Sequence, residues 1–325
     1  MTIEYTETTG IPRDRWGRPM VIAPSSKTKR VGYQRTTTFV GVLENTYNLM
    51  AWKQRQTVLG MGARKDLILA AAAADPDDKK TLNDIAEKAC EHALSSAAAT
   101  TGTALHSLTE RIDKGKPLGA VPDEYLGDIK AYEQATQNIE WLGIEAFRVH
   151  DDWKVAGTAD RIGKTKNGRL RIYDIKTGSI AYPHKMAMQL AMYARSLPYD
   201  INTDTRGTPE DGLDINTGII IHLPAGEARC DLYEINIAKG WGACLIAKQV
   251  WDWRNTKDLT HLIGDERVST WEKANRERPI GLQAIESADS LEQLRILWNA
   301  ARDADALTED FRAAARKRSE QLAAK

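Results

Sequence analysis

The sequence predicts an α/β core with helical additions at both ends. Two observations predict it: three short apolar segments follow one another closely between residues 145 and 176, and segments of helical composition lie on either side of them. A chain of 325 residues is long enough to bury a sizeable core. We expect an N-terminal arm and helices at 1–100, the core at 101–256 and a helical region at 257–325.

The N-terminal part combines an extended arm with helices. The first forty residues are rich in Thr, Pro, Gly and basic side chains, which indicates the arm. Residues 48–74 have helical composition, and Gly60 and Gly62 are expected to divide them into two helices. Further helices are predicted at 80–98, from just after Thr101-Gly102, and at 123–142.

The core is predicted to be built around a three-stranded unit. Strands are expected at 145–150, 155–162 and 170–176, and Asn167-Gly168 between the last two is a strong hairpin signal. The elements expected after them are a helix at 183–197, strands at 217–223 and 231–237, and a helix through Trp241 and Trp251. In the C-terminal region Ser290 and Gln293 fit a capping box, and the residues of one apolar helical stripe are Leu291, Leu294, Leu297 and Trp298.

The composition limits the classes of function. Lysine plus arginine and aspartate plus glutamate each number 45, so nucleic acid could be attracted only by local basic patches. The three cysteines, Cys90, Cys230 and Cys244, are far apart and suit a reducing compartment. Neither an N-terminal leader pattern nor a run of eighteen apolar residues is present. We therefore expect a cytoplasmic protein without membrane partners.

Asp174 and Lys176 are the most informative pair in the sequence. They alternate with apolar residues on a predicted strand, and residues two apart on a strand point to the same face. A metal-binding carboxylate beside a cation that activates water is what metal-assisted phosphodiester hydrolysis requires. Alone, such a pair usually marks a solvated strand surface.

Three further motifs fall in a fixed order around this pair. Gly102 precedes His106, and His106 and Glu110 share a helical face. A Gly-Thr-Ala-Asp segment ends the second predicted strand with Asp160, and Gln189 and Tyr193 share the face of a later helix. Each motif alone has an ordinary structural explanation, such as a helix histidine or a turn cap. Their joint occurrence favours one common site.

The residues of this site suit a divalent cation. His106, Asp160 and Asp174 together offer two carboxylates and an imidazole, which favours Mg²⁺ or Mn²⁺, and the Ile175 carbonyl would be a further ligand. Lys176 would orient or deprotonate the attacking water, or stabilise the phosphorane.

The order Gly-x-x-x-His, Gly-x-x-Asp, Asp-x-Lys, Gln-x-x-x-Tyr resembles the PD-(D/E)XK nuclease superfamily in its RecB-like exonuclease branch. The resemblance implies a restriction-endonuclease-like core, a mixed central sheet flanked by helices. It also implies site roles: metal binding by His106, Asp160, Asp174 and the Ile175 carbonyl, and catalysis by Lys176. The helix with Gln189 and Tyr193 would support the site and contact DNA. Glu110 matches a less regular acidic position.

The sequence departs from two groups of that branch. Three scattered cysteines cannot supply the four ligands of an iron-sulfur cluster, which the CRISPR-associated members carry, and a Walker A motif for ATP is absent. The remaining resemblance is to stand-alone bacteriophage exonucleases, which often act beside a single-strand annealing protein.

The leading hypothesis is a Mg²⁺- or Mn²⁺-dependent exonuclease, with one or two ions, that acts in phage recombination, replication or DNA repair. The alternatives are an endonuclease on the same core and a catalytically silent DNA-binding accessory protein. Tyr182, His184 and Lys185 are the best candidate DNA contacts, because they adjoin the Gln189 helix. The sequence leaves open the oligomeric state, the digestion polarity and the strand preference.

Overall fold

The computed structural model describes residues 10–26, 28–94, 97–257, 259, 280–303 and 307–323. The chain divides into two compact units, Met1–Arg254 and Asn255–Lys325. The first contains the mixed α/β core, and the second contains helices. Among the described helices, none combines the length and apolar character that crossing a lipid bilayer demands.

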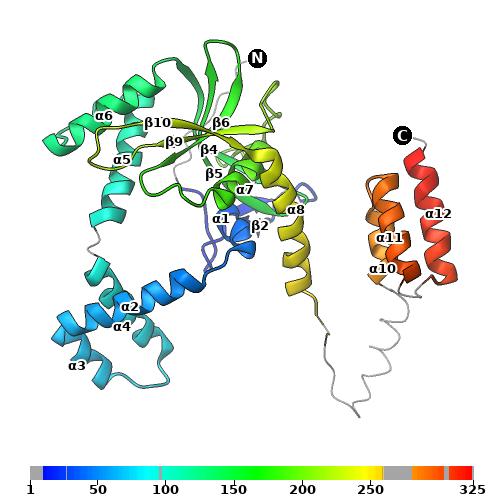
Figure 1. Ribbon diagram of the computed structural model, residues 1–325, viewed down its shortest axis with the longest axis horizontal. Helices are drawn as coiled ribbons and strands as arrows, with labels where there is room; N and C mark the ends of the chain where they lie inside the picture. Colours follow the sequence, from blue (N-terminus) through cyan, green and yellow to red (C-terminus); the bar gives the residue numbers. More distant parts are fainter. Residues whose placement is uncertain are drawn as a thin grey trace. The chain divides into compact units, whose positions relative to one another are not determined.

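A mostly antiparallel sheet forms the centre of the first unit (Figure 1). Its long strands are β4 (Ile139–His150), β5 (Val155–Thr165) and β6 (Leu170–Lys176), joined as antiparallel neighbours. β9 (Thr217–His222) runs parallel to β6, and β10 (Asp231–Asn236) closes that edge. The other edge is completed by β7 (Leu197–Asp200) and β8 (Thr205–Arg206). The predicted hairpin is present, with Gly168 at a φ of 84° in its turn.

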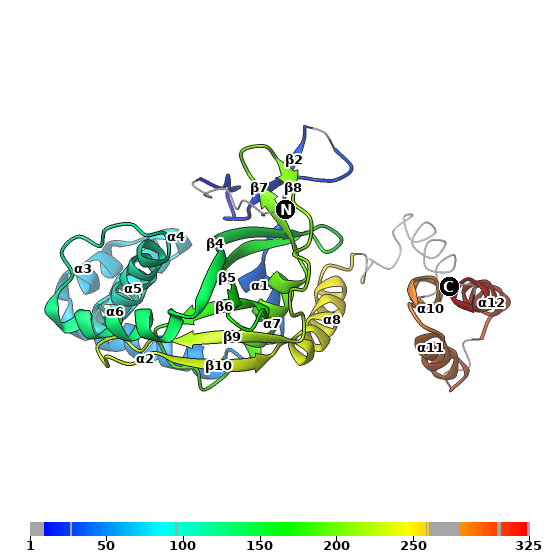
Figure 2. The same cartoon turned by 90° about the horizontal axis from the view of Figure 1, so that it is seen from above.

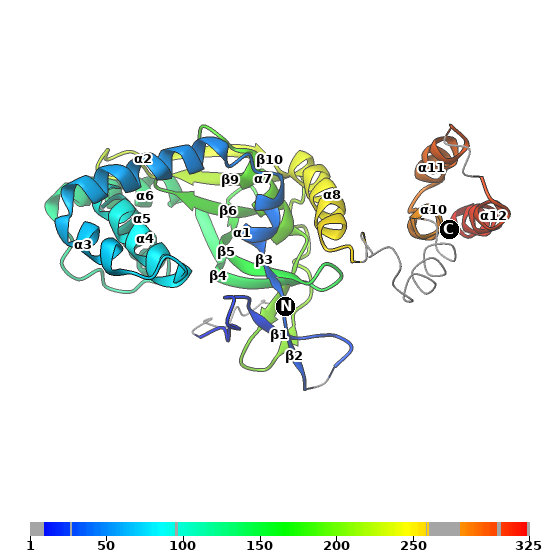
Figure 3. The same ribbon diagram turned by 90° about the horizontal axis from the view of Figure 1, so that it is seen from below.

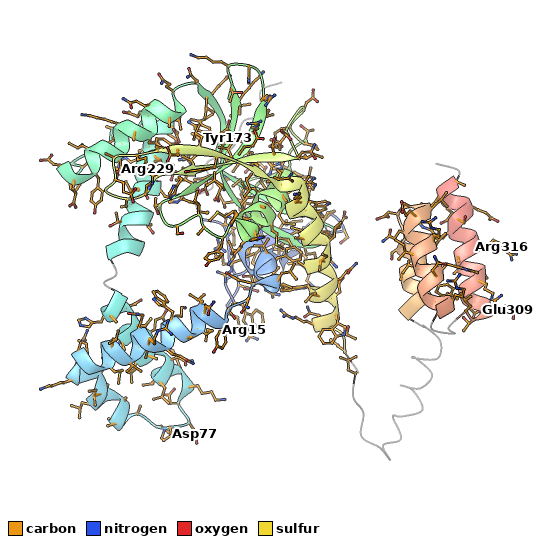
Figure 4. All side chains as sticks on the ribbon, in the orientation of Figure 1. Arg15, Asp77, Tyr173, Arg229, Glu309 and Arg316 are labelled. Atoms are coloured by element: carbon orange, nitrogen blue, oxygen red, sulfur yellow. The ribbon has the colours of Figure 1, made fainter. Side chains whose placement is uncertain are left out.

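Helices cover both faces of this sheet, and β6 shows why. Ile172 faces Leu190 of α7 (His184–Ala194), whereas Tyr173 and Ile175 pack with Tyr132 of α6 (Asp123–Thr136). Apolar side chains of the strand thus pack on both of its faces, which is typical of a strand buried on two sides. Figures 2 and 3 show α7 with α8 (Ile237–Arg254) on one side and α5 (Ala97–Asp113) with α6 on the other. Tyr173 is labelled in Figure 4.

The N-terminal segment, which means the described residues 10–26 and 28–44, packs against the sheet through Val21 and Tyr33. β1 (Met20–Ile22) and β2 (Arg30–Gly32) pair with each other, and β3 (Gln34–Arg35) adds in parallel to the start of β5. A short helix, α1 (Thr36–Val40), and a 3-10 turn, η1 (Gly41–Leu43), follow. These elements carry Thr36 and Phe39 into the core.

The helices α2 (Tyr47–Ala63), α3 (Lys65–Ala73) and α4 (Lys79–Leu94) come next. Two helices replace the predicted segment 48–74, but the break falls at Arg64, and both Gly60 and Gly62 lie inside α2. The prediction that these glycines divide the helix is therefore wrong. A Cβ at Gly60 would lie 1.8 Å from the carbonyl oxygen of Ala89, so Gly60 permits close packing of α2 against α4.

Two other boundaries differ from the sequence prediction. α5 begins at Ala97, so Gly102 lies within the helix rather than before it. α6 ends at Thr136 and β4 begins at Ile139, so the prediction of helix as far as residue 142 is wrong. Ile139 and Trp141 both pack on the α6 side of the sheet, and this two-residue alternation belongs to a strand.

The second unit contains α10 (Ile280–Ser287), α11 (Leu291–Asp303) and α12 (Glu309–Ala323). Leu294 is buried among the three helices, and Leu297 and Trp298 pack against it as the apolar stripe predicts, whereas Leu291 is 51% exposed. The capping box forms in part. The Gln293 N–H donates to the Ser290 hydroxyl at 3.2 Å, but the Gln293 side chain accepts from the N–H of Asp289 instead.

Candidate active site

The site is centred on the end of β6. Asp174 and Lys176 point to the same face, as the strand alternation predicts, and the Lys176 ammonium contacts Oδ2 of Asp174. The Asp174 carboxylate is 2% exposed, whereas the Lys176 side chain is 28% exposed. Burial, followed by the negative charge of Asp160, raises the pKa of Asp174 to about 7. A carboxylate in such surroundings favours a nearby cation.

Asp160 reaches the same point from β5. The β5–β6 ladder ends at the pair Arg161–Tyr173, and Asp160 and Asp174 are the next residues on the two strands. The Asp160 carboxylate accepts the N–H of Ile175 at 2.8 Å, in place of a backbone acceptor. A side chain thus ends the pairing of the two strands and places two carboxylates side by side.

His106 approaches from α5, on the opposite side of the sheet from α7. Its Nδ1 is 3.9 Å from Oδ2 of Asp160, and its ring hydrogen-bonds to the backbone of Ile175. Burial lowers the pKa of His106, although the charge of Asp160 acts in the other direction. The imidazole is therefore neutral at pH 7, which is the form that can ligate a metal.

Gly102 permits this approach. A Cβ at Gly102 would lie 2.7 Å from Oγ1 of Thr177, the residue directly after Lys176, which is closer than van der Waals contact allows. The glycine that the sequence prediction treated as a helix boundary is thus a contact point between α5 and the end of β6. His106 lies one turn further along α5, so the close contact at Gly102 also sets the position of His106.

Replacing Gly102 with alanine is expected to lower the hydrolysis rate by about 10- to 10²-fold, because α5 and His106 must move away from β6. The change is expected to cost about 1–3 kcal/mol of stability through overpacking. Adding Thr177→Ala should reverse both effects, since the nearest remaining atom, the Thr177 Cβ, lies at 3.8 Å. Steady-state hydrolysis and denaturant unfolding of both single variants and the double variant test this. Equal defects in Gly102→Ala and the double variant would contradict it.

Gln189 and Tyr193 support the site from α7. The Gln189 amide donates to Oδ1 of Asp174 at 3.3 Å and to the Tyr193 hydroxyl at 3.4 Å. Burial raises the pKa of Tyr193, so the phenol stays protonated, and its hydroxyl also hydrogen-bonds with Thr36. A Cβ at Gly157 would lie 2.8 Å from Oγ1 of Thr36 and 2.9 Å from Cε1 of Tyr193. The glycine three residues before Asp160 therefore makes room for this tyrosine.

Glu145 is a site residue that the sequence reasoning missed. On β4 it falls opposite Asp160, between the pairs Ile144–Arg161 and Ala146–Ala159, and its φ is 51°. Burial, followed by the charge of Asp160, raises the pKa of Glu145 to about 7. A positive φ at a non-glycine residue beside a cluster of carboxylates is typical of a functional position. The one feature of the sequence that could have indicated Glu145 is its charge among apolar residues of a strand.

The four remaining predicted residues have other surroundings in the structure. The Glu110 carboxylate pairs with Lys114 at 2.7 Å, although its charge also raises the pKa of Glu145. Tyr182 is 84% exposed and His184 is exposed at the start of α7. Lys185 pairs with Glu44 of the N-terminal segment at 2.8 Å. The metal role of Glu110 and the DNA contacts of the other three stay predictions.

The side chains of His106, Asp160 and Asp174 suit a divalent cation, but oxygens of both carboxylates are bonded to groups of the protein itself. Within the residues that the structure describes, no three His, Cys, Asp or Glu side chains are arranged to hold a metal ion. Two of the oxygens already have partners. The N–H of Ile175 donates to Oδ2 of Asp160, and the ammonium of Lys176 pairs with Oδ2 of Asp174. Lys176 is part-exposed on a flexible stem, so its displacement would free a carboxylate oxygen beside Asp160 and His106. Two adjacent carboxylates and a neutral imidazole are suitable ligands for Mg²⁺ or Mn²⁺.

Comparison with known families supports the same interpretation. Residues 70–198 match the model of the PD-(D/E)XK nuclease superfamily. This range includes every motif residue from Gly102 to Tyr193, and the mixed sheet flanked by helices is consistent with the fold of that superfamily. A search of curated proteins gives no match to the chain. Members of the matched superfamily are nucleases and generally use divalent metal ions such as Mg²⁺.

Proposed function

We propose that this protein is a divalent-metal-dependent deoxyribonuclease that hydrolyses phosphodiester bonds from DNA ends. The observation that carries the proposal is the meeting of Asp160, from the middle of β5, with Asp174 and Lys176, from the end of β6, and with His106 beside them. Acidic metal ligands next to a single ammonium suit attack of water on a phosphodiester.

In the proposed site, His106, Asp160, Asp174 and the Ile175 carbonyl would hold one or two Mg²⁺ or Mn²⁺ ions. A bound divalent cation would neutralise phosphate charge and acidify an attacking water. Lys176, with its ammonium at the mouth of the site, would orient that water and stabilise negative charge on the phosphorane. The amide of Gln189 fixes the carboxylate of Asp174, so ligand orientation does not depend on the substrate.

Tyr193 acts by position rather than by chemistry in this scheme. Its buried phenol fills the space between Thr36 and Gly157 and holds Gln189 against Asp174. Tyr182, His184 and Lys185 would contact the DNA backbone near the start of the same helix, where Tyr182 and His184 are exposed. Lys185 would then exchange its partner Glu44 for a phosphate.

The proposal of end-directed digestion rests on the resemblance of the motif order to RecB-like exonucleases and to stand-alone bacteriophage exonucleases. A role in phage recombination, replication or DNA repair, beside a single-strand annealing protein, would follow from it. We propose DNA as the substrate because residues 70–198 match a superfamily of nucleases.

Digestion of end-labelled linear DNA, single- and double-stranded, against a covalently closed circle tests the proposal with each divalent metal separately. We expect linear DNA to be degraded in Mg²⁺ or Mn²⁺ while the circle stays intact. Cutting of the circle would instead assign an endonuclease. Activity that persists in chelator, or in both Asp174→Ala and Lys176→Ala, would overturn the assignment to this site.

A further inference from the structure

A surface pocket of about 370 Å³ lies on the N-terminal segment, outside residues 70–198 of the family match. The residues that line it are Trp16, Arg18, Gln34, Arg35 and Thr38. None of them belongs to the motifs of the active site. Their chemistry is an indole, two guanidinium groups, an amide and a hydroxyl, which is a set that nucleic acid recognition uses.

The indole of Trp16 is presented to solvent by a fixed turn. It is 60% exposed, and the turn that carries it is held by an ion pair of 2.7 Å between Asp14 and Arg18. The guanidinium of Arg15 lies 4.0 Å from the centre of the indole ring, and that of Arg18 lies 4.9 Å from it. Arg15, labelled in Figure 4, is exposed, so a flat ligand could replace it on the indole.

Arg35 supplies a cation at the same pocket. Its side chain is exposed and forms no ion pair with any residue that the structure describes. Arg18, by contrast, is fixed by Asp14 and lies against Gly32, where a Cβ would come within 3.0 Å of its guanidinium carbon. The pocket therefore combines a stacking surface, one anchored cation and one cation available to a phosphate.

The pocket is tied to the active site by backbone pairing. Arg35 pairs with Ala156 on β5, and Asp160 lies four residues further along that strand, which at about 3.3 Å per residue is roughly 13 Å. The residue after Arg35, Thr36, hydrogen-bonds with Tyr193. Since stacked DNA rises about 3.4 Å per nucleotide along one strand, the two sites are separated by a few nucleotides.

We propose that this pocket binds an unpaired nucleotide of the DNA substrate, a few nucleotides from the phosphodiester that is cleaved. The base stacks on Trp16, Gln34 and Thr38 face its polar edge, and Arg35 holds the adjoining phosphate. Bases inside a duplex are covered by their neighbours, so away from the last base pair of a duplex end an exposed indole can stack only on a base that has left the helix. The substrate at this point is therefore single-stranded. The inference rests on the proposed function for its distance from the scissile bond.

Fluorescence anisotropy with a labelled oligothymidylate and a labelled blunt duplex, in EDTA to prevent turnover, tests the pocket in the full chain. Trp16→Ala is expected to weaken single-strand binding about tenfold, the usual loss for one stacked base, with little effect on the duplex. The logarithm of the binding constant falls with the logarithm of the salt concentration. Arg35→Gln is expected to make this negative slope shallower by about 0.7, as for one lost phosphate contact. Trp16→Ala should leave that slope unchanged.

Two matched controls lie elsewhere on the same unit. Trp253 is an indole of similar exposure, 67%, at the end of α8, and Arg169 is an exposed arginine at the tip of the β5–β6 hairpin. Trp253→Ala and Arg169→Gln are expected to bind single strands like the unmodified protein. Unchanged single-strand affinity in Trp16→Ala, or an equal loss of that affinity in Trp253→Ala, would refute the proposal that this pocket binds a nucleotide.

Binding in EDTA does not require catalysis, so the two proposals fail separately. Single-strand binding that is unchanged in Trp16→Ala, in a protein whose hydrolysis is metal-dependent and lost in Asp174→Ala and Lys176→Ala, would refute the pocket proposal alone. Hydrolysis that survives Asp174→Ala and Lys176→Ala, with binding still dependent on Trp16, would remove the active-site proposal alone.

Discussion

Asp174→Asn is expected to lower the hydrolysis of linear DNA on the order of 10²–10³-fold or more, because the amide can neither ligate a cation as a carboxylate does nor pair with Lys176. The side chain keeps its shape, so Gln189 and Tyr193 should stay in place. The expected loss is therefore one of rate rather than of folding. Single-turnover hydrolysis at saturating Mg²⁺ measures it.

The same substitution is expected to leave the metal-free protein as stable as before, or more stable, at pH 8. Burial raises the pKa of Asp174 to about 7 from its ordinary value of 3.8. Between these pH values the folded state holds a proton that the unfolded state has lost, so this carboxyl makes stability fall as pH rises through the window. Asparagine carries no such proton, and the fall that Asp174 contributes should disappear.

Thermal unfolding in EDTA at pH 5 and pH 8 measures this difference, and Asp252→Asn is the control. Asp252 is 59% exposed and pairs with Lys248 on the surface of α8, so its substitution should change neither activity nor the pH response. A melting temperature for Asp174→Asn well below that of the unmodified protein at pH 8 would show instead that the ionised Asp174 carboxylate stabilises the fold.

The central pair of the site could be predicted from the sequence because it depends on local geometry. Asp174 and Lys176 share a strand face by the two-residue period alone, and Gln189 and Tyr193 share a helix face by the i, i+4 relation. The order of the motifs then indicated that these faces meet. No feature of long range was needed to identify them.

Glu145 and the Trp16 pocket could not be found in that way. Glu145 enters the site because β4 pairs with β5 in a register that sets it opposite Asp160, and no local pattern fixes that register. The pocket depends on β3 adding to β5 across more than a hundred residues. Gly60 and Gly102 were misinterpreted for a related reason: each serves a close contact between distant segments, which in the sequence resembles a helix break.

Arg161 joins the fold to the site through a buried network. Its guanidinium is completely buried, pairs with Asp113 of α5 at 2.6 Å and donates to the backbone carbonyl of Asp160 at 2.7 Å. It also lies 3.2 Å from the carboxylate of Glu145. One side chain thus holds α5, which carries His106, against the strand that carries Asp160.

Arg161→Met is expected to destabilise the first unit by about 3–5 kcal/mol, because it leaves the Asp113 carboxylate buried without a cation. Burial already raises the pKa of Asp113, although Arg161 and the Tyr132 hydroxyl both favour its charged form. Adding Asp113→Asn should recover most of the loss, since the uncompensated charge is then gone. Denaturant unfolding of the two single variants and the double variant gives the coupling energy.

Arg171→Met on the neighbouring strand is the matched control. Arg171 pairs at 2.8 Å with Glu234, whose side chain is 56% exposed, and at 3.9 Å with Asp214, whose side chain is 30% exposed, so water can solvate the carboxylates that are left behind. A cost below about 1 kcal/mol is expected there. If Arg161→Met costs no more than Arg171→Met, the buried network does not fasten α5 to the sheet, and the position of His106 must depend instead on the contact between Gly102 and Thr177.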